Sequence, residues 1–230
     1  MKNMINSFHL KCICIGMMIV GVYMQQWTYN PGYLMYLAAF PIAAFLLVEA
    51  VRKTSDRKKL MKRLLLAALV VEIPMDIATF GLKEWTKWGL NQNYFFTLYI
   101  GFGVLVVVEA LNKKYQPGTM ANTLSTLAVY LASVFLSVFC RTEQGSAGVL
   151  MVVTFSLFYG NKVFSFLSAA VLYVLFLPKI TGLEFLPALS VLLLWLYNGK
   201  PGKANKITRL VFYLAYPVAY CVLRMVAPFL

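Results

Sequence analysis

Long apolar runs alternate with short polar breaks along the whole chain. A helix needs roughly 20 apolar residues to cross the hydrocarbon core of a bilayer, which is about 30 Å thick. Such runs predict membrane-spanning helices over residues 10–29, 33–51, 60–81, 94–111, 119–139, 146–160, 163–178, 184–198 and 207–228. The runs between 146 and 198 are short, so the pattern fits eight to ten spans, with nine as the central expectation. The sequence predicts an all-α protein, a polytopic bundle of transmembrane helices.

Turn-forming residues mark the breaks between these runs. Asn30-Pro31-Gly32 and Gln116-Pro117-Gly118 predict tight turns, and Asn198-Gly199-Lys200-Pro201-Gly202 predicts a longer loop. None of the polar stretches is long enough to fold as a soluble domain. We therefore expect residues 1–230 to form a single integral-membrane domain.

The composition agrees with a membrane protein. Hydrophobic residues make up 61% of the chain and charged residues 13%, whereas soluble domains carry about 25% charged residues. The excess of 21 Lys and Arg over 8 Asp and Glu gives a net charge of +13, which alone would suit a nucleic-acid-binding protein. The basic residues cluster between apolar runs instead of lining a polar domain. We therefore expect contact with membrane lipids and no nucleic acid.

The positions of the basic residues predict the orientation of the chain. Cytoplasmic ends of membrane proteins carry an excess of Lys and Arg. If the cluster between the second and third spans faces the cytoplasm, 16 of the 21 Lys and Arg residues lie on that side. The outer side then holds five, which are Lys83, Lys87, Arg141, Lys179 and Arg224. This assignment places the N-terminus in the cytoplasm and the C-terminus outside.

Glu72 and Asp76 are the clearest candidates for chemistry within the membrane. A charged group near the centre of a span costs at least about 2.5–3.5 kcal/mol, so it is a functional candidate by default. The two carboxylates are four residues apart on one face of the predicted helix, and Pro74 between them predicts a kink. They can share a proton, bind a cation, or form ion pairs with basic residues of a neighbouring helix that only stabilise the bundle.

Other polar groups lie nearer to the predicted interfaces. Glu49 precedes Arg52 by about one turn, and Glu109 precedes a Lys by one turn, which predicts interfacial ion pairs. Asn91-Gln92-Asn93 predicts a helix cap and a polar mouth at the outer start of the fourth span, and Glu143 lies in the next outer loop. The chain has one His and no metal-binding motif, so we expect no metal site.

Several segments in order resemble the TraX family. They cover nearly the whole chain and comprise residues 39–49, 63–65 running into 72–76, 93–98, 145–150, 198–202 and 212–217. The most distinctive are Ala-Phe-Pro at 39–41, Glu-Ile-Pro-Met-Asp at 72–76 and Tyr-Pro at 216–217. Each segment alone is a weak signal, and the specificity comes from their common order.

The resemblance implies an acetyl-transferring protein of the bacterial cytoplasmic membrane. The family is named for a conjugation protein that acetylates the N-terminus of pilin, and it is similar to transmembrane acyltransferases that use cytoplasmic acetyl-CoA. It therefore implies acetyl-CoA as acyl donor and a pilin-like or exported peptide as acceptor. The family pattern places the basic residue of the first span at Lys11. The basic loop with Arg52, Arg57 and Arg63 suits the phosphates of CoA, although lipid contact and topology explain the same residues.

The acid–base residues that the resemblance leads us to expect are replaced in this chain. The Asp and His of the first span correspond to Gly21 and Val22, and the His of the last span corresponds to Ala219. The Gly-Arg pair that precedes Ala-Phe-Pro corresponds to Tyr36 and Leu37. Neither Val22 nor Ala219 can act as a base, and Leu37 offers no donor to an oxyanion.

Three functions fit this combination of scaffold and substitutions. Glu72 or Asp76 supplies the base of an acyltransferase, aided by Lys11 and Arg63. Alternatively, the chain is a non-catalytic membrane subunit or regulatory partner of a pilus, secretion or peptide-export assembly. The third function is a proton-coupled transporter that uses Glu72 and Asp76, against which the sequence shows no internal repeat.

Overall fold

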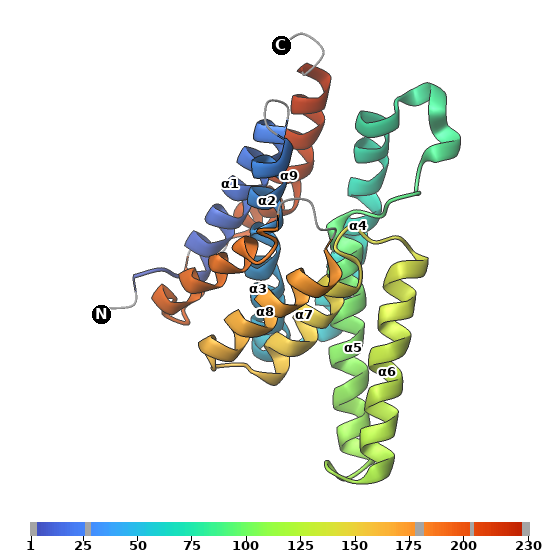
Figure 1. Cartoon of the computed structure of the whole chain (residues 1–230), viewed down its shortest axis with the longest axis vertical. Helices are drawn as coiled ribbons and strands as arrows, with labels where there is room; N and C mark the ends of the chain where they lie inside the picture. The colour runs from blue at the N-terminus through green and yellow to red at the C-terminus, as the bar shows by residue number, and fades with distance from the viewer. Residues whose placement is uncertain (1–3, 26–28, 178–181, 203–204, 227–230) are drawn as a thin grey trace.

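The computed structural model describes residues 4–25, 29–177, 182–202 and 205–226, and within these ranges the fold consists of helices joined by loops (Figure 1). The elements are α1 (Ser7–Gln25), α2 (Tyr29–Leu37), α3 (Ala39–Lys53), α4 (Arg57–Phe80), η1 (Leu82–Lys87), α5 (Tyr94–Lys114), α6 (Met120–Phe139), α7 (Gly145–Leu157), α8 (Lys162–Phe176), η2 (Leu186–Leu196) and α9 (Lys206–Val226). Lys2, Lys179, Lys203 and parts of three predicted spans (10–29, 163–178 and 207–228) lie outside the described residues. The all-α prediction is confirmed.

Among the described residues, four stretches are long and apolar enough to cross a bilayer. They are Ser7–Gln25, Pro31–Lys53, Tyr94–Lys114 and Met120–Phe139. Four shorter apolar helices follow at Gly145–Leu157, Lys162–Phe176, Leu186–Leu196 and Leu210–Arg224. Helix α4 has 24 residues, but a basic first half and two carboxylates near its end make it less apolar than the others. The chain is thus a helical membrane protein, and nine full spans stay a prediction.

Two predicted elements are wrong in detail. Asn30-Pro31-Gly32 forms no turn, because these residues belong to the start of α2, where Pro is tolerated without the loss of a helical hydrogen bond. Residues 186–196 form the 3-10 helix η2 instead of an α-helix. At about 2.0 Å rise per residue, eleven residues of this type extend about 22 Å. Helix α4 continues through Pro74, and the expected kink stays a prediction.

Helix α3 is the centre of the bundle. It packs against α1, α2, α5, α7 and η2. In the most apolar 18 residues of the candidate span Pro31–Lys53, which includes α3, 67% of the residues are buried. In the corresponding 18 residues of α6 only 17% are buried. Figure 1 shows α5 and α6 as a long antiparallel pair beside the rest of the bundle. Exposed Leu131, Phe135 and Phe139 make the outer face of α6 suitable for contact with lipid.

Loops that the charge pattern assigns to one side of the membrane meet at one end of the molecule. At the end we call inner, Lys53 Nζ donates to Gly199 O over 2.5 Å, and Arg57 pairs with Glu109. The segment before α1 also lies there, since Ile5 N donates to Leu196 O over 3.0 Å. At the opposite, outer end, Gln92 pairs with Thr142 in a short parallel bridge. The contacts group the loops at two ends, and which end faces the cytoplasm stays a prediction.

Glu49 anchors the inner end. It pairs with Lys53 over 2.6 Å and not with Arg52, whose guanidinium instead donates to Ser156 O. Both Glu49 carboxylate oxygens also accept from the Tyr197 hydroxyl, over 2.5 and 2.6 Å. The predicted pairing of Glu109 with Lys113 is confirmed, over 2.9 Å.

Removal of the Glu49 carboxylate is expected to cost more stability than removal of the Glu109 carboxylate. The Glu49 side chain is 6% exposed and the Glu109 side chain 37% exposed. Glu49→Ala leaves the buried Tyr197 hydroxyl without its acceptor, and we expect a loss of about 2 kcal/mol in the free energy of unfolding. Glu109→Ala breaks solvent-exposed pairs and should cost less than about 1 kcal/mol. Unfolding with increasing SDS in mixed micelles measures both, and equal losses would contradict the prediction.

Candidate functional site

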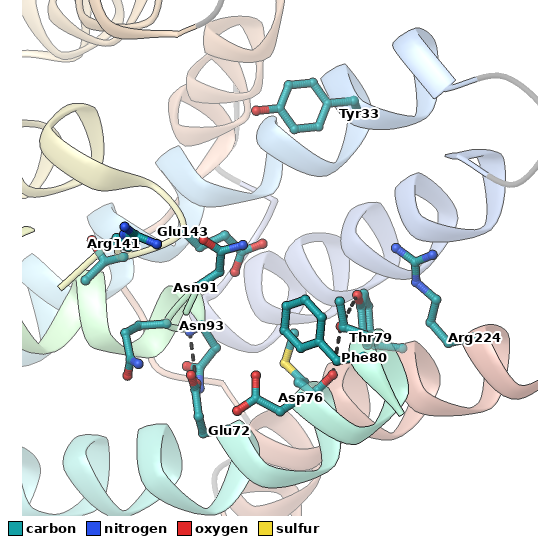
Figure 2. Close-up of a pocket in the computed structure, with 14 residues that line it drawn as sticks. Tyr33, Glu72, Asp76, Thr79, Phe80, Asn91, Asn93, Arg141, Glu143 and Arg224 are labelled. Atoms are coloured by element: carbon teal, nitrogen blue, oxygen red, sulfur yellow. Dashed lines mark hydrogen bonds between the residues drawn. The ribbon is translucent and has the colours of Figure 1, made fainter. Parts of the chain in front are cut away.

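A cavity of about 540 Å³ opens at the outer end of the molecule (Figure 2). The second half of α4 forms one wall, and the loops at 91–93 and 141–143 form another. Residues of α2 and α9 complete the lining. The cavity therefore lies where five segments that are distant in the sequence meet.

Glu72 contributes a carboxylate with one free oxygen. Its Oε2 accepts from the backbone N–H of Asn93 over 3.1 Å and from Asn93 Nδ2 over 2.6 Å (Figure 2). Among the described residues, its buried Oε1 has no hydrogen-bond partner. Asn93 also caps α5, because its side-chain oxygen accepts from Phe95 N over 3.0 Å, as the sequence predicts. The capping residue of α5 thus holds Glu72 in place through Oε2, and Oε1 is buried without a hydrogen-bond partner among the described residues.

Asp76 lies one turn after Glu72 on the same face of α4. It is buried, and its Oδ2 accepts from the backbone N–H of Gly89 over 2.8 Å. Gly89 has a φ of 74°, a conformation that glycine adopts without strain. The loop before α5 is therefore tied to α4 next to Glu72, and both predicted carboxylates line the same cavity.

Glu143 adds a third carboxylate from the loop between α6 and α7. It accepts hydrogen bonds from the hydroxyl of Tyr36 and from the backbone N–H of Tyr94. Its own N–H donates to Gln92 O over 2.8 Å, and Gln92 N donates to Arg141 O over 3.1 Å. These backbone bonds fix the loop against the start of α5.

Desolvation by the surrounding protein raises the pKa of Glu143 to about 7. The hydrogen bonds from Tyr36 and Tyr94 act in the opposite direction, and the negative charge of Glu72 adds to the rise. Glu143 keeps exposed surface where it borders the cavity, so water there moderates the shift. The direction follows from the geometry: Glu143 binds a proton more readily than an ordinary Glu.

The start of α5 holds two of the three carboxylates. The backbone N–H of Asn93 bonds to Glu72, and that of the next residue, Tyr94, bonds to Glu143. The first N–H groups of a helix carry partial positive charge and favour anions. The two carboxylates consequently lie side by side at one positive helix end, from two different elements.

Two arginines accompany the acidic groups. Figure 2 shows Arg141 and Arg224 on opposite sides of the view, with Glu72 and Asp76 between them. The guanidinium of Arg224 lies 5.5 Å from the centre of the Tyr220 ring. An acidic centre flanked by cations can bind an ammonium group whose carrier also bears negative charge.

The other predicted site residues lie elsewhere. Lys11 Nζ lies 5.4 Å from the centre of the Phe212 ring, between α1 and α9, and does not line the cavity. Arg52 and Arg57 lie at the inner end. Arg63 precedes Glu72 by nine residues, which is about 14 Å along α4. The structure therefore brings Glu72 and Asp76 together but separates them from Lys11 and the three arginines.

The positions that replace the expected acid–base residues are packed apolar sites. Val22 and Leu37 are buried, and Ala219 is partly buried. A Cβ on Gly21 would lie 2.6 Å from the backbone nitrogen of Tyr36, so no larger residue fits there. The chemistry of the cavity therefore has to come from other side chains.

Several cavity residues carry no signal that could have identified them from the sequence. Tyr33, Thr79 and Tyr220 belong to apolar helices, where such residues commonly only pack. Thr79 Oγ1 and the Tyr220 hydroxyl lie 3.0 Å apart and connect α4 with α9. The sequence identifies Arg224 and Glu143 as charged residues on the outer side, but it does not predict that both line one cavity.

Within the part of the chain that the structure describes, no three His, Cys, Asp or Glu residues are grouped so that they could hold a metal ion. Comparison with known proteins adds one result. A protein family described as "TraX protein" matches residues 8–227. No curated protein and no solved structure matches the chain.

Proposed function

The chain belongs to the TraX family, and we propose that it is an integral-membrane acyltransferase that transfers an acetyl group to an amine in the outer cavity. One observation carries the proposal. Glu72, Asp76 and Glu143, from two distant segments, converge on one cavity of about 540 Å³. Carboxylates within a membrane-spanning helix are costly, and the convergence of two of them on α4 with a third from an outer loop is typical of a functional site.

The carboxylates suit an amine acceptor. An ammonium group is attracted by the negative charge of these carboxylates, which line the cavity. Before an amine can attack a thioester it has to lose a proton, and a nearby carboxylate can take that proton. The flanking Arg141 and Arg224 favour an acceptor that also carries negative charge, such as an acidic or pilin-like exported peptide.

Acetyl-CoA is the proposed acyl donor. Arg52, Arg57 and Arg63 are candidates to bind its phosphates at the inner end. Arg52 and Arg57 have protein partners in Ser156 and Glu109, so phosphate would compete with these contacts. The inner arginines and the outer carboxylates lie toward opposite ends of α4, which suits a donor on the cytoplasmic side and an acceptor outside. We place the protein in the bacterial cytoplasmic membrane accordingly.

Acetyl transfer across vesicles tests the proposal. The purified protein is inserted into lipid vesicles, and labelled acetyl-CoA is supplied on the side of the basic loop. An acidic peptide with a free N-terminus is supplied on the other side, and the same peptide with a formylated N-terminus is the control. We expect label only on the free peptide. No CoA binding together with no labelled peptide would overturn the proposal.

A non-catalytic membrane subunit is the second candidate. The observation that favours it is the apolar packing at Val22, Leu37 and Ala219, where the resemblance leads us to expect acid–base residues. This candidate predicts a stable complex with another membrane subunit of a pilus, secretion or peptide-export assembly. Copurification of such a subunit with an inactive protein would favour it over the enzyme.

A further inference from the structure

Two buried tyrosine hydroxyls and the carboxylate of Glu143 form a chain of hydrogen bonds that runs from the core to the cavity. The Tyr216 hydroxyl donates to the Tyr36 hydroxyl over 3.0 Å, and the Tyr36 hydroxyl donates to Glu143 Oε1. Tyr36 is 5% exposed and Tyr216 1% exposed. The donors behind Glu143 are therefore held within the protein, while its carboxylate borders the cavity.

Packing fixes these two tyrosines. The rings of Tyr36 and Tyr216 lie 5.7 Å apart, and the ring of Tyr94 lies 5.5 Å from that of Tyr216. Gly21 lies directly against the backbone of Tyr36, so α1 and α2 are in close contact there. Since α1, α2, α5 and α9 all hold this cluster, the orientation of Glu143 is set by the fold itself.

The three cavity carboxylates differ in how they are held. Glu72 and Asp76 each accept a hydrogen bond from a backbone N–H, that of Asn93 and that of Gly89 respectively. Glu143 accepts from one backbone N–H and from a tyrosine hydroxyl that itself accepts from another tyrosine. A carboxylate with positioned donors on one side and a cavity on the other has the geometry of a general base.

We propose that Glu143 takes the proton from the acceptor amine, and that Tyr36 and Tyr216 are positioning residues that orient its carboxylate. This assignment rests on the proposed acetyl transfer. Glu72 and Asp76 then hold the ammonium group, and Glu143 is the base that neither the charge pattern nor the resemblance identifies.

The proposed step balances in atoms and charge. The bound ammonium gives one proton to Glu143, and the neutral amine attacks the thioester carbonyl of the acyl donor. A C–N bond forms, the C–S bond breaks, and the second proton of the nitrogen leaves with the thiolate as a thiol. Glu143 then releases its proton to water in the cavity, so the products are the amide, the thiol and one proton.

The pH dependence follows from the groups that face Glu143. These are Tyr36 of α2, Tyr216 of α9, Tyr94 at the start of α5, Glu72 of α4, and Arg141 of its own loop. A base works only when it is deprotonated, and desolvation raises the pKa of Glu143 to about 7. The rate should therefore fall as the pH falls through the raised pKa of Glu143, at a higher pH than for an ordinary Glu.

Variants at Glu143 and Tyr36 test the assignment in the vesicle assay over a range of pH. Glu143→Gln keeps the shape of the side chain and should lower kcat about 100-fold, while KM for the amine changes little. Glu143→Asp keeps a carboxylate base, so it should retain part of the activity. It should also retain the fall in rate at low pH, which is the acidic limb of the plot of rate against pH. Tyr36→Phe removes a hydrogen bond that lowers the pKa of Glu143, so the acidic limb should move to higher pH.

Tyr99→Phe is the matched control, because Tyr99 is a partly buried tyrosine of α5 that does not line the cavity. Its pH profile should equal that of the wild type. If the wild type is active and Glu143→Gln transfers at the same rate with the same profile, the assignment is overturned and acetyl transfer stands. An inactive wild type overturns both.

Discussion

Glu72→Gln is expected to lower kcat/KM for the amine acceptor about 30- to 100-fold. Loss of one partner of a buried, hydrogen-bonded charge pair costs about 2–5 kcal/mol, and each 1.4 kcal/mol is tenfold. Glu72 is only partly buried, so the lower part of this range applies. The amide keeps a hydrogen-bond acceptor for Asn93 but offers the ammonium group no charge. The vesicle assay measures this effect as a rise in KM.

Glu84→Gln provides the comparison for Glu72→Gln. Glu84 lies in η1, outside the cavity, and pairs with Lys87 through a side chain that is 50% exposed. Its replacement removes the same charge at the outer end without touching the cavity, so the kinetics should stay at the wild-type level. If both variants reduce transfer equally, net charge at this end, and not the cavity, is responsible.

Gly21→Leu is expected to destabilise the fold by about 3 kcal/mol. A Cβ at this position would lie 2.6 Å from the backbone nitrogen of Tyr36 and 2.8 Å from its Cα. Backbone atoms cannot move aside as a flexible side chain can, so α1 and α2 have to separate. The same separation displaces the Tyr36 hydroxyl from Glu143. We therefore expect both a lower free energy of unfolding in mixed micelles and a shifted pH profile of transfer.

Gly16→Leu tests the same substitution in the same helix. A Cβ on Gly16 meets no atom within 4 Å, so the new side chain has room. Leucine favours a helix over glycine by up to about 1 kcal/mol, and the stability should stay unchanged or rise slightly. Equal losses at the two positions would show that the close approach of α1 and α2 is not the cause.

The sequence predicts the helices well because hydrophobicity and charge are local signals. The predicted span 60–81 corresponds to α4, which begins three residues earlier. Asp56 caps that helix, with its side chain accepting from Lys59 N over 2.9 Å, inside a basic segment that apolar patterning does not include. The spacing of Glu72 and Asp76 also predicts their common face, and both line one cavity.

The sequence does not predict which helices meet at that cavity. Glu143 and Tyr36 are 107 residues apart, and a charge in a short loop gives its side of the membrane but not its partner. For Lys11 the prediction is wrong in the opposite way. The family pattern suggests a place near the carboxylates, but Lys11 lies over the ring of Phe212 instead. Local sequence patterns predict how deep a residue lies in the membrane and on which face of its helix. The packing of helices that completes the site depends on contacts between distant parts of the chain.

The contact between the segment before α1 and the end of η2 sets an order for assembly in the membrane. Asn198 N donates to Ile5 O over 2.9 Å, and Ser7 N donates to Lys200 O over 2.9 Å. These bonds join the start of α1 to the residues after η2, so they form only after α2 to α8 and η2 have been inserted. In a nascent chain halted within α8 these bonds cannot form, and limited proteolysis of the segment before α1 would distinguish it from the finished protein.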